Sequence, residues 1–178
     1  MSKIIAIMLL LCCGMMLFGC ADDNGRRKAE QQKTIVVTDS VGRKVELPYP
    51  LERVAVCNVY NAELITAVGA IDKIVGVDNY IFKDQSGFKN RFNEAQVFGI
   101  SQNAMNYEKL AELAPQAVII TGEGTWRDAQ EMLDRFGIKV IVINSYYTDQ
   151  FADNCRLIGR IFGREEQAEE LVNYFNDK

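Results

Sequence analysis

Hydrophobic and polar residues divide the chain into three stretches with different patterns. Residues 4–18 form an almost unbroken apolar run. Residues 21–33 contain no aromatic or β-branched residue and are rich in Asp, Asn, Gln, Arg and Lys, so they cannot bury enough apolar surface to offset the entropy of ordering. From Thr34 onward, short apolar runs alternate with segments of helical periodicity. This pattern predicts a leader, a flexible tether and one folded domain.

The folded part is predicted to begin with a β-hairpin. Residues 34–38 are rich in β-branched side chains, residues 39–42 form a turn cluster, and residues 43–47 are predicted to form the return strand. Further short apolar runs are typical of strands covered on both faces. They lie at residues 54–57, 74–77, 117–120 and 139–143, with a shorter candidate at 97–98.

Helices are predicted between these strands. Asn61 is expected to cap a helix that extends to Val68, just before Gly69. Thr125 and Asp128 have the spacing of a capping box, and the helix that they would begin has a predicted core face. That face consists of Trp126, Ala129, Leu133 and Phe136, and the remaining helices are expected within residues 78–96 and at 107–113, 151–162 and 165–178.

Strands that alternate with helices predict an α/β fold, with a mainly parallel sheet, flanking helices and the hairpin in front. Ligands of such sheets bind beyond the carboxyl ends of the strands. Those ends are followed by aromatic residues that would give a large ligand a flat amphipathic surface. The candidate ligand-binding residues are Tyr60, Tyr80, Trp126, Tyr146 and Tyr147, together with Arg127 for an anionic group. The alternative is that some of these aromatic residues only cover the edge of the sheet.

The residue composition limits the metal sites and catalytic sites that the chain could form. The chain has no histidine, which excludes zinc sites built on His and Ser-His-Asp or Cys-His catalysis. We therefore expect no catalytic residues, no metal site and no cofactor. The net charge of −4 argues against nucleic acid as a partner. Cys57 and Cys155 are expected to be buried thiols rather than a disulfide framework.

The leader has the features of a secretory signal. Lys3 precedes the apolar run, which is too short to span a bilayer comfortably. The run ends in Leu17-Phe18-Gly19-Cys20, which resembles a lipobox, with Phe18 where a small residue is usual. We expect Cys20 to carry lipid and to tether the protein at the outer face of a membrane. An ordinary cleaved signal and an uncleaved anchor helix are the alternatives.

Several segments resemble periplasmic substrate-binding proteins of the ABC transporters for iron-siderophores, haem and cobalamin. Residues 34–56 (TIVVTDSVGRKVELPYPLERVAV) match the opening of that family, and residues 67–77 (AVGAIDKIVGV) match its next segment. Residues 106–120 (NYEKLAELAPQAVII) match a third, with Gln116 where Asp is usual. The resemblance continues through residues 137–143 and 158–165.

The resemblance implies two α/β lobes that are joined by one long helix and hold ligand between them. After the signal peptide at 1–19 and the tether at 20–33, the resemblance gives the N-terminal lobe at 34–163 and the start of the interlobe helix at 164–178, with the second lobe absent. Glu108 matches the family position implied to dock on the permease. The alternative for Glu108 is a carboxylate that stabilises the first turn of a helix.

The expected function is therefore that of a lipid-anchored extracytoplasmic solute-binding component of an ABC importer, or a truncated form of one. Its ligand would be an iron-siderophore, haem or a corrinoid, and it would catalyse no reaction. One alternative is a single-lobe surface adaptor that binds a protein partner. A second is a flavodoxin-like enzyme, which is disfavoured because Gly122-Glu123-Gly124 lacks the third glycine of a phosphate-binding loop and has Arg127 there.

Overall fold

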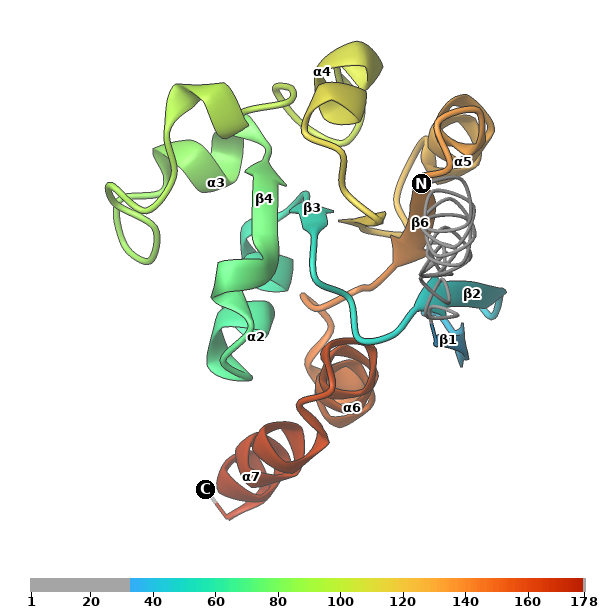
Figure 1. Ribbon diagram of the computed structural model, residues 1–178. Coiled ribbons are helices and arrows are strands. Elements are labelled where there is room, and N and C mark those ends of the chain that lie inside the picture. The colour runs from blue at the N-terminus through green and yellow to red at the C-terminus, as the bar shows by residue number, and fades with distance from the viewer. Residues whose placement is uncertain (1–32, 178) are drawn as a thin grey trace, which may run out of the picture. The chain divides into compact units, whose positions relative to one another are not determined.

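The computed structural model of the protein describes residues 33–177 (Figure 1). The predicted signal peptide, Cys20 and nearly all of the predicted tether lie outside these residues. Within them, no helix is long and apolar enough to cross a membrane.

A parallel sheet of four strands forms the centre of the fold. The strand order is β4 (Ile74–Val77), β3 (Val54–Val56), β5 (Ala117–Ile120) and β6 (Lys139–Val142). This arrangement confirms the predicted α/β fold. The fifth candidate strand, at residues 97–98, contributes only a parallel bridge between Val77 of β4 and Val97.

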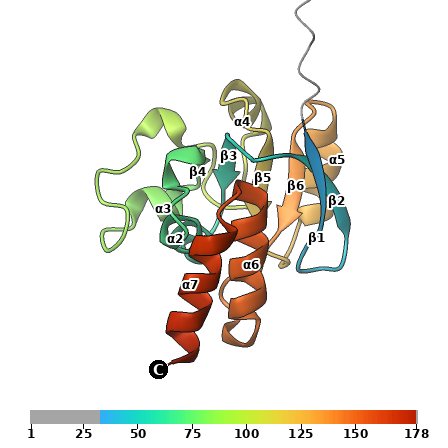
Figure 2. The same cartoon turned by 60° about the horizontal axis from the view of Figure 1, so that its bottom comes forward.

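Helices cover both faces of the sheet, because the buried strands alternate their side chains between two hydrophobic clusters. Val54 and Val56 pack into one cluster and Ala55 into the other. Figure 2 shows α2, α6 and α7 on one side of the sheet and α5 on the other. The helices are α2 (Val59–Ala67), α3 (Asn79–Lys83), α4 (Tyr107–Glu112), α5 (Trp126–Asp134), α6 (Phe151–Phe162) and α7 (Glu165–Asn176), with 3-10 turns η1 (Ile71–Lys73), η2 (Glu94–Gln96) and η3 (Thr148–Gln150).

The predicted hairpin, β1 (Thr34–Thr38) and β2 (Lys44–Pro48), closes the open edge of β6. The backbone N–H of Ser40 donates to the carbonyl of Val142 at 2.9 Å, and the Asp39 carboxylate accepts from the N–H of Val142 at 3.3 Å. Arg43 donates to the carbonyl of Val140 at 3.1 Å. An edge that is covered in this way does not offer unpaired backbone groups to another chain.

Two local predictions are wrong for identifiable reasons. Asn58, not Asn61, caps α2, because its side chain accepts from the N–H of Tyr60 at 3.0 Å. Asn61 is buried inside that helix and donates to the carbonyl of Cys57. At α5, the Thr125 hydroxyl donates to Asn103 instead of capping the helix.

The predicted core face of α5 is only partly correct. Ala129 and Leu133 are fully buried, whereas Trp126 is partly buried and Phe136 is 45% exposed. Phe136 lies beyond the end of the helix, where the chain turns through Gly137 at a positive φ of 70°. The helical period therefore no longer directs its side chain into the core.

Helices α6 and α7 form a close-packed pair after Gly163, which ends α6 in the left-handed conformation with φ 64°. Gly159 permits the contact, because a Cβ atom at that position would lie 2.5 Å from the Cβ of Ala168. Arg156 and Glu169 form an ion pair across the two helices at 2.7 Å. These contacts hold α7 against α6.

Candidate functional site

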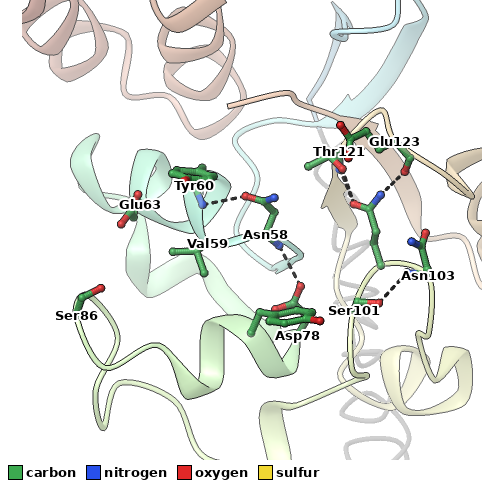
Figure 3. Close-up of a pocket in the computed structure, with 12 residues that line it drawn as sticks. Asn58, Val59, Tyr60, Glu63, Asp78, Ser86, Ser101, Asn103, Thr121 and Glu123 are labelled. Atoms are coloured by element: carbon green, nitrogen blue, oxygen red, sulfur yellow. Dashed lines mark hydrogen bonds between the residues drawn. The ribbon is translucent and has the colours of Figure 1, made fainter. Parts of the chain in front are cut away.

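A cavity of about 680 Å³ lies at the carboxyl ends of three neighbouring strands (Figure 3). Each strand is followed by a segment that contributes to the wall. Residues 58–60 and Glu63 follow β3, Asp78 and Tyr80 follow β4, and Thr121 and Glu123 follow β5. Ser86 and the loop at residues 101–103 complete the lining. The position agrees with the edge at which the sequence predicts a ligand.

Asp78 organises one side of this cavity. Its carboxylate caps α3 by accepting from the N–H of Ile81 at 3.0 Å, and it accepts from the N–H of Asn58 at 3.1 Å. The side chain is almost completely buried, and burial raises the pKa of the Asp78 carboxyl, although hydrogen bonds from the N–H groups of Ile81, Asn58 and Tyr80 oppose the shift. One buried group thus fixes the turns that carry Tyr60 and Tyr80.

Gln102 organises the opposite side. Its side-chain oxygen accepts from the N–H of Thr121 at 2.9 Å and from the Thr121 hydroxyl at 2.8 Å. Its side-chain nitrogen donates to the carbonyl of Glu123. These bonds hold the loop at residues 101–103 against the end of β5, so that its polar side chains face the cavity.

The structure separates the four predicted tyrosines into two groups. Tyr60 and Tyr80 line the cavity, with exposures of 55% and 63%. Tyr146 and Tyr147 do not line it, but their rings are 4.3 Å apart and the Tyr146 hydroxyl donates to Glu123 at 3.1 Å. Burial together with hydrogen bonding to Tyr147 and Glu123 raises the pKa of Tyr146. Tyr146 is therefore linked to the wall through Glu123.

Trp126 and Arg127 lie in a different hollow. The Arg43 and Arg127 guanidinium groups lie 4.3 Å and 4.1 Å from the centroid of the Trp126 ring. This hollow is lined mainly by α5 together with Arg43, and it shares no lining residue with the cavity. Ligand contact by Trp126 and Arg127 remains a prediction of the sequence.

The polar residues of the wall are those that sequence reasoning missed. Asp78 and Thr121 directly follow predicted strands, and that position is a usable signal. Glu63 and Gln102 carry no such signal. The helical turn after β3 brings Glu63 to the cavity, and hydrogen bonds to Thr121, 19 residues away in the sequence, bring Gln102 there.

Glu108 lies in the first turn of α4, where its side chain is exposed. Asn106 caps this helix by accepting from the N–H of Lys109 at 2.9 Å. Both interpretations of Glu108, permease docking and stabilisation of the helix N-terminus, are compatible with this position.

Residues 33–177 contain no group of three or more Cys, Asp or Glu side chains placed to hold a metal ion. Cys57 and Cys155 are free, buried thiols, as expected. Burial is the main cause that raises the pKa of each, to about 11 for Cys155, so both are poor nucleophiles at neutral pH.

Comparisons with known proteins point to periplasmic binding proteins. The sequence profile of a family described as periplasmic binding protein matches residues 54–178. The fold resembles a periplasmic solute-binding protein from Veillonella parvula, with 28% identity and a TM-score of 0.68 over 82% of this chain and 46% of that chain. A comparison with curated protein sequences finds no significant match.

Two further solved structures have the same fold at lower identity. The petrobactin-binding protein YclQ from Bacillus subtilis is 17% identical, with a TM-score of 0.66 over 82% of this chain and 50% of that chain. The heme-binding protein HmuT is 21% identical, with a TM-score of 0.62 over 79% and 44%. The chain thus spans about half the length of the solved structures that it matches.

Proposed function

The chain belongs to the periplasmic binding protein family, and we propose that it is a solute-binding component of an ABC importer, carrying at least the N-terminal lobe of such a protein. The ligand would be an iron complex, such as a siderophore chelate or haem, or cobalamin. Cys20 would carry the lipid that holds the protein at the extracytoplasmic face of the membrane, and Glu108 would dock on the permease. In this role the protein catalyses no reaction.

The observation that carries the proposal is the cavity at the carboxyl ends of β3, β4 and β5. Tyr60 and Tyr80 give it exposed aromatic surface, while Asn58, Gln102 and Thr121 give it hydrogen-bonding groups. Binding sites for small molecules combine these two properties in a hollow of this size. This exposed lining would form one side of a binding site, which fits a lobe that closes on ligand against a second lobe.

The first experiment is a binding titration of the full-length protein against a panel of candidate solutes. Ferric deferoxamine, ferric enterobactin, haem and cyanocobalamin represent the proposed classes, and isothermal titration calorimetry measures each affinity. Micromolar or tighter binding of one class, weakened by replacing Tyr60 and Tyr80 with alanine, is expected. Absence of binding to every solute by a folded protein would contradict the proposal.

A surface adaptor remains the second candidate, because a mostly apolar hollow adjoins the cavity and shares Tyr60 and Glu63 with it. Leu64, Ala67, Phe151 and Leu171 contribute to its lining, from α2, α6 and α7. Nearby, Phe175 is 51% exposed and stacks on Phe151 with ring centroids 4.3 Å apart. A protein partner that protects this hollow from hydrogen exchange, in the absence of any bound solute, would favour the adaptor.

A further inference from the structure

The lining of the cavity carries acidic groups and no basic ones. Glu63, Asp78 and Glu123 contribute carboxyl groups. The other lining residues are uncharged Asn, Gln, Ser, Thr, Tyr and Val side chains. A ligand that enters this wall therefore encounters negative charge and neutral hydrogen-bonding groups.

The two exposed glutamates that line the cavity come from different elements, and Glu63 also lines the neighbouring apolar hollow. Glu63 lies on α2 and Glu123 follows β5, and Figure 3 shows them on opposite sides of the hollow. Within residues 33–177, Glu63 has no ion-pair partner, and the Glu123 carboxylate accepts a hydrogen bond only from the neutral hydroxyl of Tyr146. Their charges are therefore not offset by a cation in the wall.

The Arg and Lys side chains of residues 33–177 lie outside the lining of the cavity, and several of them are paired elsewhere. Arg43 bonds Asp39 at 2.6 Å, and Lys109 bonds Glu112 at 3.2 Å. Arg127 lies against Trp126 in the separate hollow. Lys83 and Lys89, on α3 and in the loop after it, are not among the residues that line the cavity. Because exposed charges are screened beyond about 8 Å at physiological salt, the charges that line the wall itself, Glu63, Asp78 and Glu123, bear most directly on the choice of ligand.

Ferric chelates differ in the charge that they present to such a wall. Three singly charged hydroxamates neutralise ferric iron, and the amine of deferoxamine makes its chelate singly positive. Three doubly charged catecholates leave a triply negative chelate, and the propionates make haem anionic. Like charges brought close together oppose binding, whereas opposite charges favour it.

From this arrangement we infer that Glu63 and Glu123 select the ligand by charge, so that the cavity takes neutral or positively charged metal complexes and rejects anionic ones. The inference rests on the proposed function and names the class of solute within it. It assigns the specificity for ligand charge to two residues that line the cavity.

The test compares the same four solutes on the full-length protein and on four variants. Glu63→Gln and Glu123→Gln are combined in one variant and made singly as well, and Glu166→Gln, an exposed carboxylate on α7, changes the net charge of the protein without touching the cavity. The parent protein is expected to bind ferric deferoxamine or cyanocobalamin at least about tenfold more tightly than ferric enterobactin or haem, a difference of about 1.4 kcal/mol.

The double variant should lose most of its preference for ferric deferoxamine over the anionic solutes, and Glu166→Gln should keep it. Lower salt should enlarge the preference in the parent and not in the double variant. Tighter binding of ferric enterobactin or haem by the parent protein would overturn the charge assignment and leave the proposed function intact. Failure of a folded protein to bind any of the four would overturn both.

Discussion

The Asp78 carboxylate accepts a hydrogen bond from the backbone N–H of Asn58 at 3.1 Å, and this bond joins the turns that follow two neighbouring strands. Asn58 adopts a positive φ of 76°, which is uncommon for a residue other than glycine. The same Asp78 side chain caps α3. The wall of the cavity therefore depends on one buried carboxyl group that fixes an unusual backbone conformation.

Replacing Asp78 with alanine should destabilise the domain, because the N–H groups of Asn58 and Ile81 would lose their acceptor. An unsatisfied buried group typically costs about 1–3 kcal/mol of unfolding free energy. Asp78→Asn keeps one acceptor oxygen and should lose less. Urea denaturation followed by circular dichroism measures both, and equal stabilities of all three proteins would contradict this role.

The raised pKa of Asp78 predicts a dependence of stability on pH. The folded protein holds the Asp78 proton more tightly than the unfolded chain does. The associated stabilisation is fully present below the unfolded pKa and is lost as the pH rises through the folded pKa. The difference in unfolding free energy between the parent and Asp78→Asn should change in that window, and a difference independent of pH would refute the prediction.

The loop at residues 101–103 should depend on Gln102. Gln102→Ala removes its bonds to Thr121 and Glu123, so the polar wall would no longer be held against the end of β5. We expect the affinity for the bound solute to fall about tenfold, equivalent to about 1.4 kcal/mol. Gln85→Ala is the matched control, because Gln85 is exposed and makes only a long bond to the carbonyl of Lys83. Similar affinities for both variants would argue against a positioning role.

The contact between α6 and α7 predicts an unusual response to alanine. A glycine inside a helix normally costs roughly 0.5–1 kcal/mol relative to alanine. Gly159→Ala should nevertheless destabilise the domain by about 1–3 kcal/mol, because the added Cβ would meet Ala168 and the carbonyl of Arg164. The double variant Gly159→Ala with Ala168→Gly should recover part of the loss in a thermal melt. Stabilisation by Gly159→Ala alone would show that the helices can separate at no cost.

Lipid attachment is predicted for Cys20 and can be tested by its removal. Cys20→Ala should move the protein from the membrane fraction to the soluble fraction and abolish the mass increment of a diacylglyceryl group. Cys13→Ala, in the same leader, should leave both unchanged. A Cys20→Ala protein that stays in the membrane fraction would point to an uncleaved anchor helix instead.

The sequence predicts the sheet well because each strand is a short apolar run covered on both faces, and such runs carry their own signal. It also predicts the edge of the sheet at which Tyr60 and Tyr80 lie. The sequence predicts Asn61 as the cap of α2, whereas the helix begins at Val59, directly after the cap Asn58, so the boundary lies earlier than the local pattern indicates.

The remaining wall of the cavity is set by tertiary contacts. Gln102 reaches Thr121 across 19 residues, and the hairpin residue Arg43 is brought to the face of Trp126. Neither pairing follows from a local pattern of hydrophobic and polar residues. The position of Trp126 in a hollow of its own could therefore not be predicted from the aromatic residues that follow the strands.

The central claim is that solute binds at the carboxyl ends of β3, β4 and β5, and an NMR titration of the labelled full-length protein tests it most directly. Addition of the solute that binds in calorimetry should shift the amide signals of residues 58–60, Asp78, residues 101–103 and Thr121. The amides of α5, around Trp126 and Arg127, should move little. Shifts confined to α5, or to the apolar hollow between α2 and α7, would contradict the account.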